Sequence, residues 1–157
     1  MRYWLMKSEP DVFSIDHLRA RPNQTEHWDG VRNFQARNFM RTMEVGDRAF
    51  FYHSSCAEPG VAGIVQIARE AQPDFTSWDT KSEYYDPRSK PEKPYWYMVD
   101  VRFERKLARL VPLAELRANR ALKKMRLLAR GNRLSIMPVT EGEWNAILKM
   151  ERITSAR

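Results

Sequence analysis

The chain has 157 residues, a size that fits one domain with a core of its own, and we expect residues 1–157 to form a single domain. Its 27 lysines and arginines against 20 acids give a formal charge of +7, which favours an anionic partner. One cysteine, Cys56, excludes an intrachain disulfide and a cysteine-built metal cage. The sequence shows neither a membrane-spanning apolar run nor a signal-peptide pattern, so we expect a cytoplasmic protein without membrane contact.

The positive charge is concentrated in one part of the chain. Between Arg102 and Arg133 there are eleven lysines and arginines against two acids, a net charge of +9, whereas the remainder of the chain is −2. A basic sector of this density is typical of nucleic-acid-binding proteins. The solvated face of an amphipathic helix has the same composition, so both interpretations stay open at this point.

The first elements are short. Residues 3–6 read as an aromatic and apolar strand, which ends before Pro10 because proline lacks a backbone donor. Ser14 is placed to cap a helix over residues 15–20, and Pro22 closes it. Residues 22–27 read as a polar loop.

The stretch from Trp28 to Arg41 combines an aromatic residue, an Asp-Gly turn and a mixture of arginines and amides. Arg37 and Arg41 lie four residues apart and so share one face of a helix. The opposite face is a core-facing stripe with helical spacing, made of Ala36, Phe39, Met40 and Met43. The sequence predicts a helix that packs on one side and offers guanidinium and amide groups on the other.

Three longer strands follow. Residues 48–53 alternate between two apolar faces, residues 61–68 read as a buried strand in which Gly63 permits a close backbone approach, and residues 95–104 read as a long strand. The last two are separated by the proline-rich loop 73–94, whose length is typical of functional or mobile segments.

The last part of the chain reads as helices and one strand. Pro112 precedes a helix over residues 113–118, a second helix is expected over residues 120–129, and residues 133–138 form a final strand. Thr140 with Glu143 forms a capping box for the terminal helix. Five or six strands mixed with short helices, without regular βαβ alternation, predict an α+β fold built on a small mixed β-barrel.

Four short motifs carry a family resemblance: WLMKSEP from Trp4, WDGVRNFQARN from Trp28, FYHS from Phe51 and RLS from Arg133. Together and in this order they resemble the EVE family of the PUA-like superfamily, over nearly the whole chain. The resemblance implies a PUA-like barrel flanked by short helices. It also implies a non-catalytic pocket that accepts a nucleobase, with modified cytosine in DNA as the favoured ligand and modified RNA as the other.

The resemblance implies a ligand site composed of the residues that match the family's motifs. They are Lys7, Ser8, Glu9, Trp28, Val31, Arg32, Asn33, Arg37, Asn38, Tyr52, His53, Ser54, Asp86, Arg88, Ser89, Arg133, Leu134 and Ser135. Phe34 stands where the family often has tyrosine, so a hydroxyl is missing there.

Residues of these types match what a base pocket requires. Trp28 or Tyr52 offers a ring for stacking, the amides and hydroxyls offer donors and acceptors for the base edge, and the arginines offer planar forks for phosphate. Flipping a base out of a duplex costs a few kcal/mol, about what one stack and a few hydrogen bonds offset. We expect a monomer that binds nucleic acid without a cofactor or a metal.

Two other functions fit parts of the sequence. A charge-driven RNA-binding protein would explain the basic sector but would not discriminate between bases. A hydrolase could pair Cys56 with His53 as nucleophile and base, although no nucleophile-elbow motif surrounds either residue. The three histidines show no metal-ligand spacing, and no glycine-rich phosphate loop is present.

Overall fold

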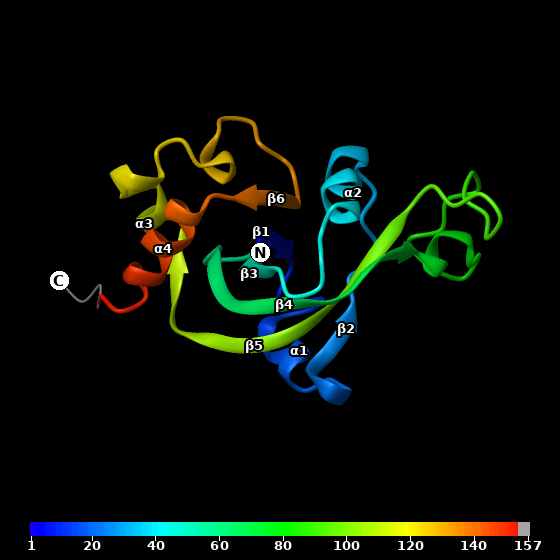
Figure 1. Cartoon of the computed structure of the whole chain (residues 1–157), viewed down its shortest axis with the longest axis horizontal. Helices are drawn as coiled ribbons and strands as arrows, with labels where there is room; N and C mark the ends of the chain where they lie inside the picture. Colours follow the sequence, from blue (N-terminus) through cyan, green and yellow to red (C-terminus); the bar gives the residue numbers. More distant parts are fainter. Residues whose placement is uncertain (154–157) are drawn as a thin grey trace.

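The structure, a computed structural model, describes residues 1–153, and one mixed sheet organises them (Figure 1). The strand order is β2-β5-β4-β3-β1-β6; β1 and β3 are parallel, and the other neighbours are antiparallel. The strands are β1 (Tyr3–Ser8), β2 (Thr25–His27), β3 (Arg48–His53), β4 (Gly60–Pro73), β5 (Tyr97–Pro112) and β6 (Ile136–Val139). The α-helices are α1 (Ile15–Arg19), α2 (Phe34–Arg41), α3 (Leu113–Ala118) and α4 (Glu141–Met150). The expected α+β fold is confirmed.

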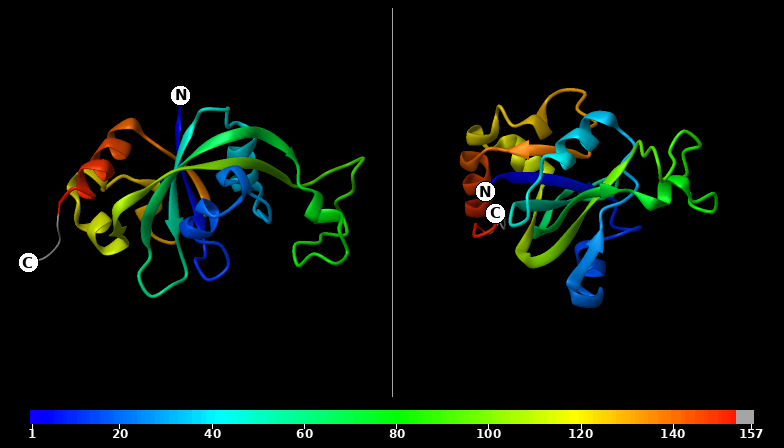
Figure 2. Two further views of the ribbon diagram at one scale, coloured as in Figure 1. Left: turned by 90° about the horizontal axis from the view of Figure 1, so that it is seen from below. Right: turned by 45° about the vertical axis from the view of Figure 1, so that its right-hand side comes forward.

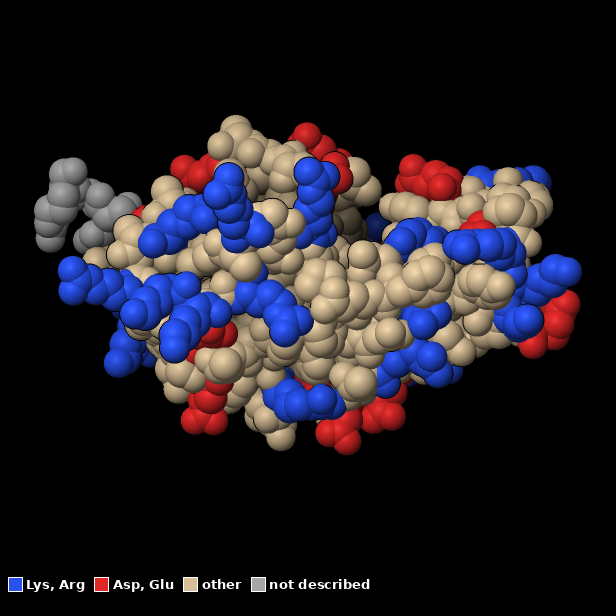
Figure 3. Space-filling model, turned by 90° about the horizontal axis from the view of Figure 1, so that it is seen from above, with Lys and Arg blue, Asp and Glu red and all other residues tan. Residues whose placement is uncertain are grey.

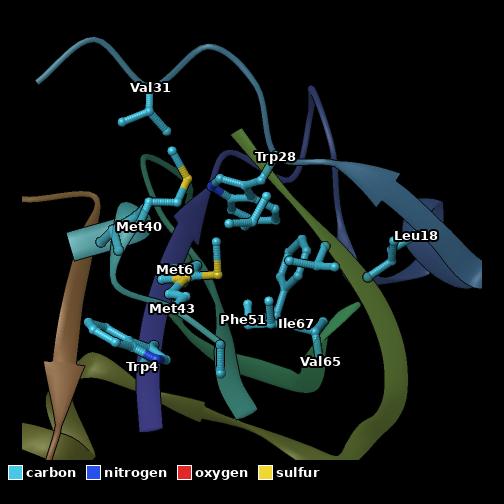
Figure 4. Close-up of a cluster of buried hydrophobic side chains, with 14 of the residues drawn as sticks. Trp4, Met6, Leu18, Trp28, Val31, Met40, Met43, Phe51, Val65 and Ile67 are labelled. Carbon is cyan, nitrogen blue, oxygen red and sulfur yellow. The ribbon is translucent and has the colours of Figure 1, made fainter. Parts of the chain in front are cut away.

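The sheet carries a core on each face. Period two in β3 sends Phe51 into a core that α1 and α2 cover, and Phe50 into a core that α3 and α4 cover, as the alternation in the sequence predicts. Figure 4 shows the first core, in which Trp28, Val31 and Met40 gather beyond the end of β1. In the second core the ring of Trp144 stacks on Phe50 at 3.9 Å between centroids.

The long strands β4 and β5 bend across the molecule (Figure 2). Their pairing shifts register at four places, and such bulges bend a sheet and increase its twist. Gly63 lies at one of them, and a Cβ there would meet the Ile15 side chain at 2.7 Å. The close backbone approach expected at Gly63 is therefore confirmed, and it seats α1 against the sheet.

Local capping signals correctly predict the starts of α1 and α4. Ser14 and His17 form a capping box at α1, and Thr140 and Glu143 form one at α4. The Asn33 side chain accepts the Ala36 N–H at the start of α2, a cap that the sequence analysis does not identify. Among residues 1–153, no helix is long and apolar enough to cross a membrane.

The helix expected over residues 120–129 is wrong. This segment forms two 3₁₀ turns, η3 (Arg120–Leu122) and η4 (Arg126–Leu128). Its buried side chains, Leu122, Met125 and Leu127, are not spaced as one face of an α-helix. Its many cations would also repel one another at α-helical spacing, because no acid lies among them.

Other boundaries also differ from the sequence prediction. The strand expected over residues 61–68 is β4, which extends to Pro73, and the strand expected over residues 95–104 is β5, which extends to Pro112. Within the expected loop 22–27, residues Pro22–Gln24 form a 3₁₀ turn (η1), and Thr25–His27 form β2, which pairs with β5. This pairing partner lies far along the chain, so a polar segment becomes a strand through a contact that local sequence does not show. The strand expected over 133–138 begins only at Ile136.

Residues 73–96 form a lobe that projects from the sheet at the right of Figure 1. Its regular structure is one 3₁₀ turn, η2 (Phe75–Trp78), so the expected long loop is confirmed. Inside the lobe the buried hydroxyl of Ser89 accepts a hydrogen bond from Ser77 Oγ at 2.8 Å and another from the Tyr95 N–H at 3.0 Å.

Candidate nucleic-acid interface

The parallel pairing of β1 and β3 brings the first group of expected site residues together. It sets Lys7 opposite Tyr52 and Ser8 opposite His53. The Lys7 N–H donates to the Ser135 carbonyl at 2.8 Å, and the Ser54 N–H donates to the Ser8 carbonyl at 3.0 Å. Three segments that are far apart in the sequence thus meet at one place, which we call the sheet-end site: Lys7, Ser8, Tyr52, His53, Ser54 and Ser135.

Lys7 is the cation of the sheet-end site. Its side chain is half-buried, and burial lowers the pKa of its ammonium group. Its Nζ lies 5.9 Å from the centre of the Tyr52 ring, and no ion pair to Lys7 occurs in residues 1–153. A partly desolvated cation without a carboxylate partner attracts an anion or a polar oxygen more strongly than a solvated one.

Tyr52 and Trp28 are both buried, but on opposite faces of the sheet: Tyr52 in the core under α3 and α4, and Trp28 in the core under α1 and α2. Burial raises the pKa of the Tyr52 hydroxyl. Trp28 is only 7% exposed; its ring meets the Phe51 ring edge-on at 5.4 Å, and its backbone N–H donates to the Val99 carbonyl at 2.7 Å. Val31 is buried in the same core as Trp28 (Figure 4). In this structure neither aromatic ring offers an open face, and only Tyr52 adjoins the sheet-end site.

His53 has a structural role in the sheet-end site. Its Nε2 accepts the Ile15 N–H at 3.2 Å, which caps the start of α1. Burial lowers the pKa of the imidazole, in agreement with a neutral acceptor nitrogen. Because that nitrogen is occupied, it is not placed to take a proton from Cys56.

Arg32 fixes the lobe 73–96 to the start of α2. Its guanidinium donates to the Tyr84 carbonyl at 3.0 and 2.8 Å and to the buried Asp74 carboxylate at 3.1 Å. The N–H of Gly30, whose φ is +78°, reaches the same carboxylate at 2.9 Å. The donors of Arg32 are thus engaged within the protein, and these hydrogen bonds set the position of the lobe.

Asp86, Arg88 and Ser89 belong to the lobe and are not next to Lys7 in the sheet. Asp86 accepts hydrogen bonds from the Arg88 guanidinium and from Trp96 Nε1 at 2.8 Å, and these bonds lower the pKa of its carboxyl well below the usual value. A hollow of about 270 Å³ opens beside them. Its lining includes Arg32, Tyr84, Tyr85, Arg88 and Trp96.

The other expected residues divide between α2 and the approach to β6. Arg37 donates to the Tyr95 carbonyl at 2.8 Å and to the Asn38 amide oxygen. Glu9 and Arg133 are exposed, and the Leu134 N–H donates to Asn132 Oδ1 at 3.1 Å. Asn132, which sequence reasoning leaves unassigned, therefore shapes the turn that delivers Ser135 to Lys7.

The basic sector divides into two parts. The β5 cations have partners: Arg105 pairs with Glu151 at 2.7 Å, Lys106 with Asp16 at 3.1 Å, and Arg109 with Glu115 at 2.7 Å. Residues 117–133, which we call the strap, contain no acid, and within the described chain none of their cations forms an ion pair. The exposed cations of the strap are Arg117, Arg120, Lys123, Lys124, Arg126, Arg130 and Arg133.

Both ends of the strap reach the sheet-end site. Arg117 is close enough to oppose electrostatically the rise in the pKa of Tyr52, and Arg133 lies two residues before Ser135. Figure 3 shows lysine and arginine side chains gathered over this part of the surface and, separately, over the lobe. The role of Arg117 was missed from sequence, because α3 meets β3 only in the folded chain.

The fold and this site define a small α+β domain of the PUA-like type with a polar site beside a basic strap. Residues 2–150 match the EVE domain family, and the chain belongs to that family. The resemblance found in the sequence motifs is thereby confirmed.

Solved and curated relatives are similar over nearly the whole chain. Thymocyte nuclear protein 1 from Homo sapiens is 49% identical over 166 residues, covering 95% of this chain and 73% of the relative. The human THYN1 protein in complex with 5-methylcytosine containing DNA has a TM-score of 0.94 and 47% identity, covering 98% of this chain and 99% of that one. A Pseudomonas syringae protein has a TM-score of 0.91 and 49% identity, covering 95% of this chain and 99% of that one.

Proposed function

We propose that this protein binds nucleic acid that carries a modified base, with 5-methylcytosine in DNA as the foremost ligand, and that it does so without catalysis. The observation that carries the proposal is the similarity, at 47% identity and across the whole fold, to a human protein in complex with 5-methylcytosine containing DNA. Modified RNA is the second ligand class. The protein acts as a cytoplasmic monomer in this proposal.

The sheet-end site supports the proposal chemically. It joins an ammonium group, hydroxyls and main-chain groups, with the Tyr52 ring as the apolar neighbour of Lys7. A base that leaves the duplex needs a polar edge contact together with an apolar surround, and the two are adjacent here. A methyl group on the base adds apolar area, whose burial contributes about 0.8 kcal/mol per carbon.

The strap supports binding of the flanking backbone. Its cations are exposed and form no ion pair within residues 1–153, and both ends of the strap reach the site. Phosphate contacts of this kind supply affinity without sequence information. A protein that used the strap alone would be the charge-driven RNA binder, which is distinguished by a lack of discrimination between bases.

A non-catalytic role also agrees with the position of His53. Its Nε2 accepts the Ile15 N–H, so the Cys56–His53 pair lacks the nucleophile-to-base hydrogen bond that a hydrolase needs.

The test is fluorescence anisotropy with duplexes that differ only in one cytosine, either plain, 5-methyl or 5-hydroxymethyl, at two salt concentrations. A parallel series uses RNA with and without a modified base. We expect a preference for one modified base that persists at the higher salt concentration. Equal binding to every duplex, weakening together with salt, would contradict the proposal.

A matched pair of variants locates the site. Lys7→Met keeps the length of the side chain and removes the charge; we expect about a tenfold loss of affinity for the modified duplex, since a charge-assisted hydrogen bond contributes roughly 1.5–3 kcal/mol. Lys106→Met makes the same change at an exposed, paired lysine on β5 and should bind as the wild type does. If both variants behave alike, the sheet-end site is not the binding site.

A further inference from the structure

Three arginines lie over aromatic rings along α2 and the base of the lobe. The Arg41 Cζ is 4.4 Å from the centre of the Tyr97 ring, the Arg37 Cζ is 4.8 Å from that of Phe34, and the Arg88 Cζ is 5.2 Å from that of Tyr95. We call this surface the arginine–aromatic face, and it comprises Phe34, Arg37, Arg41, Arg88, Tyr95 and Tyr97.

The face has a rigid foundation. The Phe34 ring stacks on the buried ring of Trp96 at 4.7 Å with 22° between their planes. Trp96 is held in turn by its indole N–H, which donates to Asp86 at 2.8 Å. Arg37 reaches across to the Tyr95 carbonyl at 2.8 Å and so ties α2 to the strand that leads into β5.

The outer side of the face is exposed. Phe34 has 47% of its surface exposed, which is unusual for a phenylalanine in a chain with two well-filled cores. The Arg88 side chain is 56% exposed, and Arg41 is also exposed. Within residues 1–153 Arg41 has neither an ion pair nor a hydrogen bond from its guanidinium, so packing on Tyr97 is the contact that orients it.

A guanidinium laid over a ring presents its other side as a flat, weakly hydrated cation. Nucleobases stack on aromatic rings and on guanidinium planes alike, and they do so with little sequence preference. Because the arginines are already ordered by their rings, a base that stacks there does not have to immobilise a free side chain.

We propose that the arginine–aromatic face binds unpaired nucleotides of a single strand by stacking. The proposal rests on the proposed function for the origin of that strand: a duplex that releases a modified base leaves unpaired nucleotides, and these stack on the face. The face and the strap thus divide the binding, with bases stacked on the one and phosphates held by the other.

The two surfaces differ in their response to salt. Phosphate contacts on the strap release counterions and weaken steeply as salt rises, whereas stacking persists. Single-strand binding that survives at high salt therefore isolates the face from the strap.

The test measures binding of an unmodified oligothymidylate, and of an oligouridylate, each of about ten nucleotides, at high salt. Arg41→Lys keeps the positive charge and removes the planar fork, and Arg41→Ala removes both. We expect both variants to bind the single strand about tenfold more weakly than the wild type. Lys106→Ala, at an exposed lysine of β5 outside both surfaces, is the control and should match the wild type. The two oligonucleotides distinguish a DNA strand from an RNA strand.

Three outcomes would overturn the proposal: a wild type that does not bind single strands at high salt, an Arg41→Lys variant that binds as tightly as the wild type, or an equal loss in Lys106→Ala. Phe34→Leu gives a second test of the face, since it keeps an apolar side chain but removes the ring, and thermal unfolding verifies that each variant is folded.

The ratio of affinities for methylated and plain duplexes should be unchanged in Arg41→Lys. If the wild type binds methylated and plain duplexes equally but Arg41→Lys still loses single-strand binding, the proposed function is wrong, whereas single-strand binding by the arginine–aromatic face is supported.

Discussion

The cations of β5 and those of the strap are close in sequence but differ in their partners. Arg105, Lys106 and Arg109 on β5 each reach an acid from another part of the chain, and they hold α4, α1 and α3 respectively. The seven strap cations have no such partner in the described residues, while the strap's apolar side chains, Leu122, Met125 and Leu127, are buried. Net charge in a sequence thus says little until the partner of each charge is known.

The largest expected effect comes from the strap. Lys123→Ala with Lys124→Ala should lower the affinity for duplex DNA by up to about a hundredfold at ~0.1 M salt, because each lost phosphate contact reduces the log–log salt slope by about 0.9. The free energy of unfolding should change by less than about 0.5 kcal/mol, since both side chains are exposed. Anisotropy across a salt series and chemical denaturation measure the two effects. An unchanged salt slope would mean that the strap does not contact the backbone.

The second largest effect is expected for the ion pair between Arg105 on β5 and Glu151 at the end of α4. Arg105→Ala leaves the Glu151 carboxylate, buried at 7% exposure, with the Ala108 N–H at 3.1 Å as its remaining donor. We expect a loss of about 2 kcal/mol in the free energy of unfolding, because a buried charge without its partner is costly. Urea denaturation measures it, and DNA affinity should be retained. A variant that is stable but binds DNA poorly would place Arg105 with the strap.

The pH dependence of stability should show a smaller effect of the ion pair between Arg105 and Glu151, and none of the strap cations. The hydrogen bonds from Arg105 lower the pKa of Glu151 in the folded protein below its usual 4.5, even though burial opposes them. The unfolded chain therefore binds the proton more readily, so this stabilisation is complete above pH 4.5 and is lost as the pH falls through the lowered folded value. Glu151→Gln should give a shallower loss of stability over that interval in denaturation curves. The strap variant should follow the wild-type curve.

The smallest effect is expected for Lys106→Ala. Its pair with Asp16 is exposed on both sides, with 48% and 53% of the side chains accessible, and such pairs contribute at most about 1 kcal/mol. The variant should lie within about 0.5 kcal/mol of the wild type in denaturation experiments and bind DNA normally. A loss as large as that of Arg105→Ala would show that exposure does not decide the value of these pairs.

The sequence by itself determined the elements whose signals are local. The alternation in residues 48–53 and the capping residues Ser14 and Thr140 depend on side chains within four positions of one another. The family motifs also indicated most of the residues that meet at the sheet-end site. Local hydrogen bonds and the periods of helix and strand are the physical reason.

Only the tertiary structure decided how the candidate site is divided. The β1–β3 pairing brings Lys7 next to Tyr52, whereas Asp86 and Ser89 lie in the lobe that Arg32 holds in place. Trp28 is buried in the core under α1 and α2. β2 became a strand because β5 offers it an edge, and Arg105 found its acid 46 residues away. Which charge is neutralised and which stays available depends on distances across the fold, and these are set by packing between segments far apart in the chain.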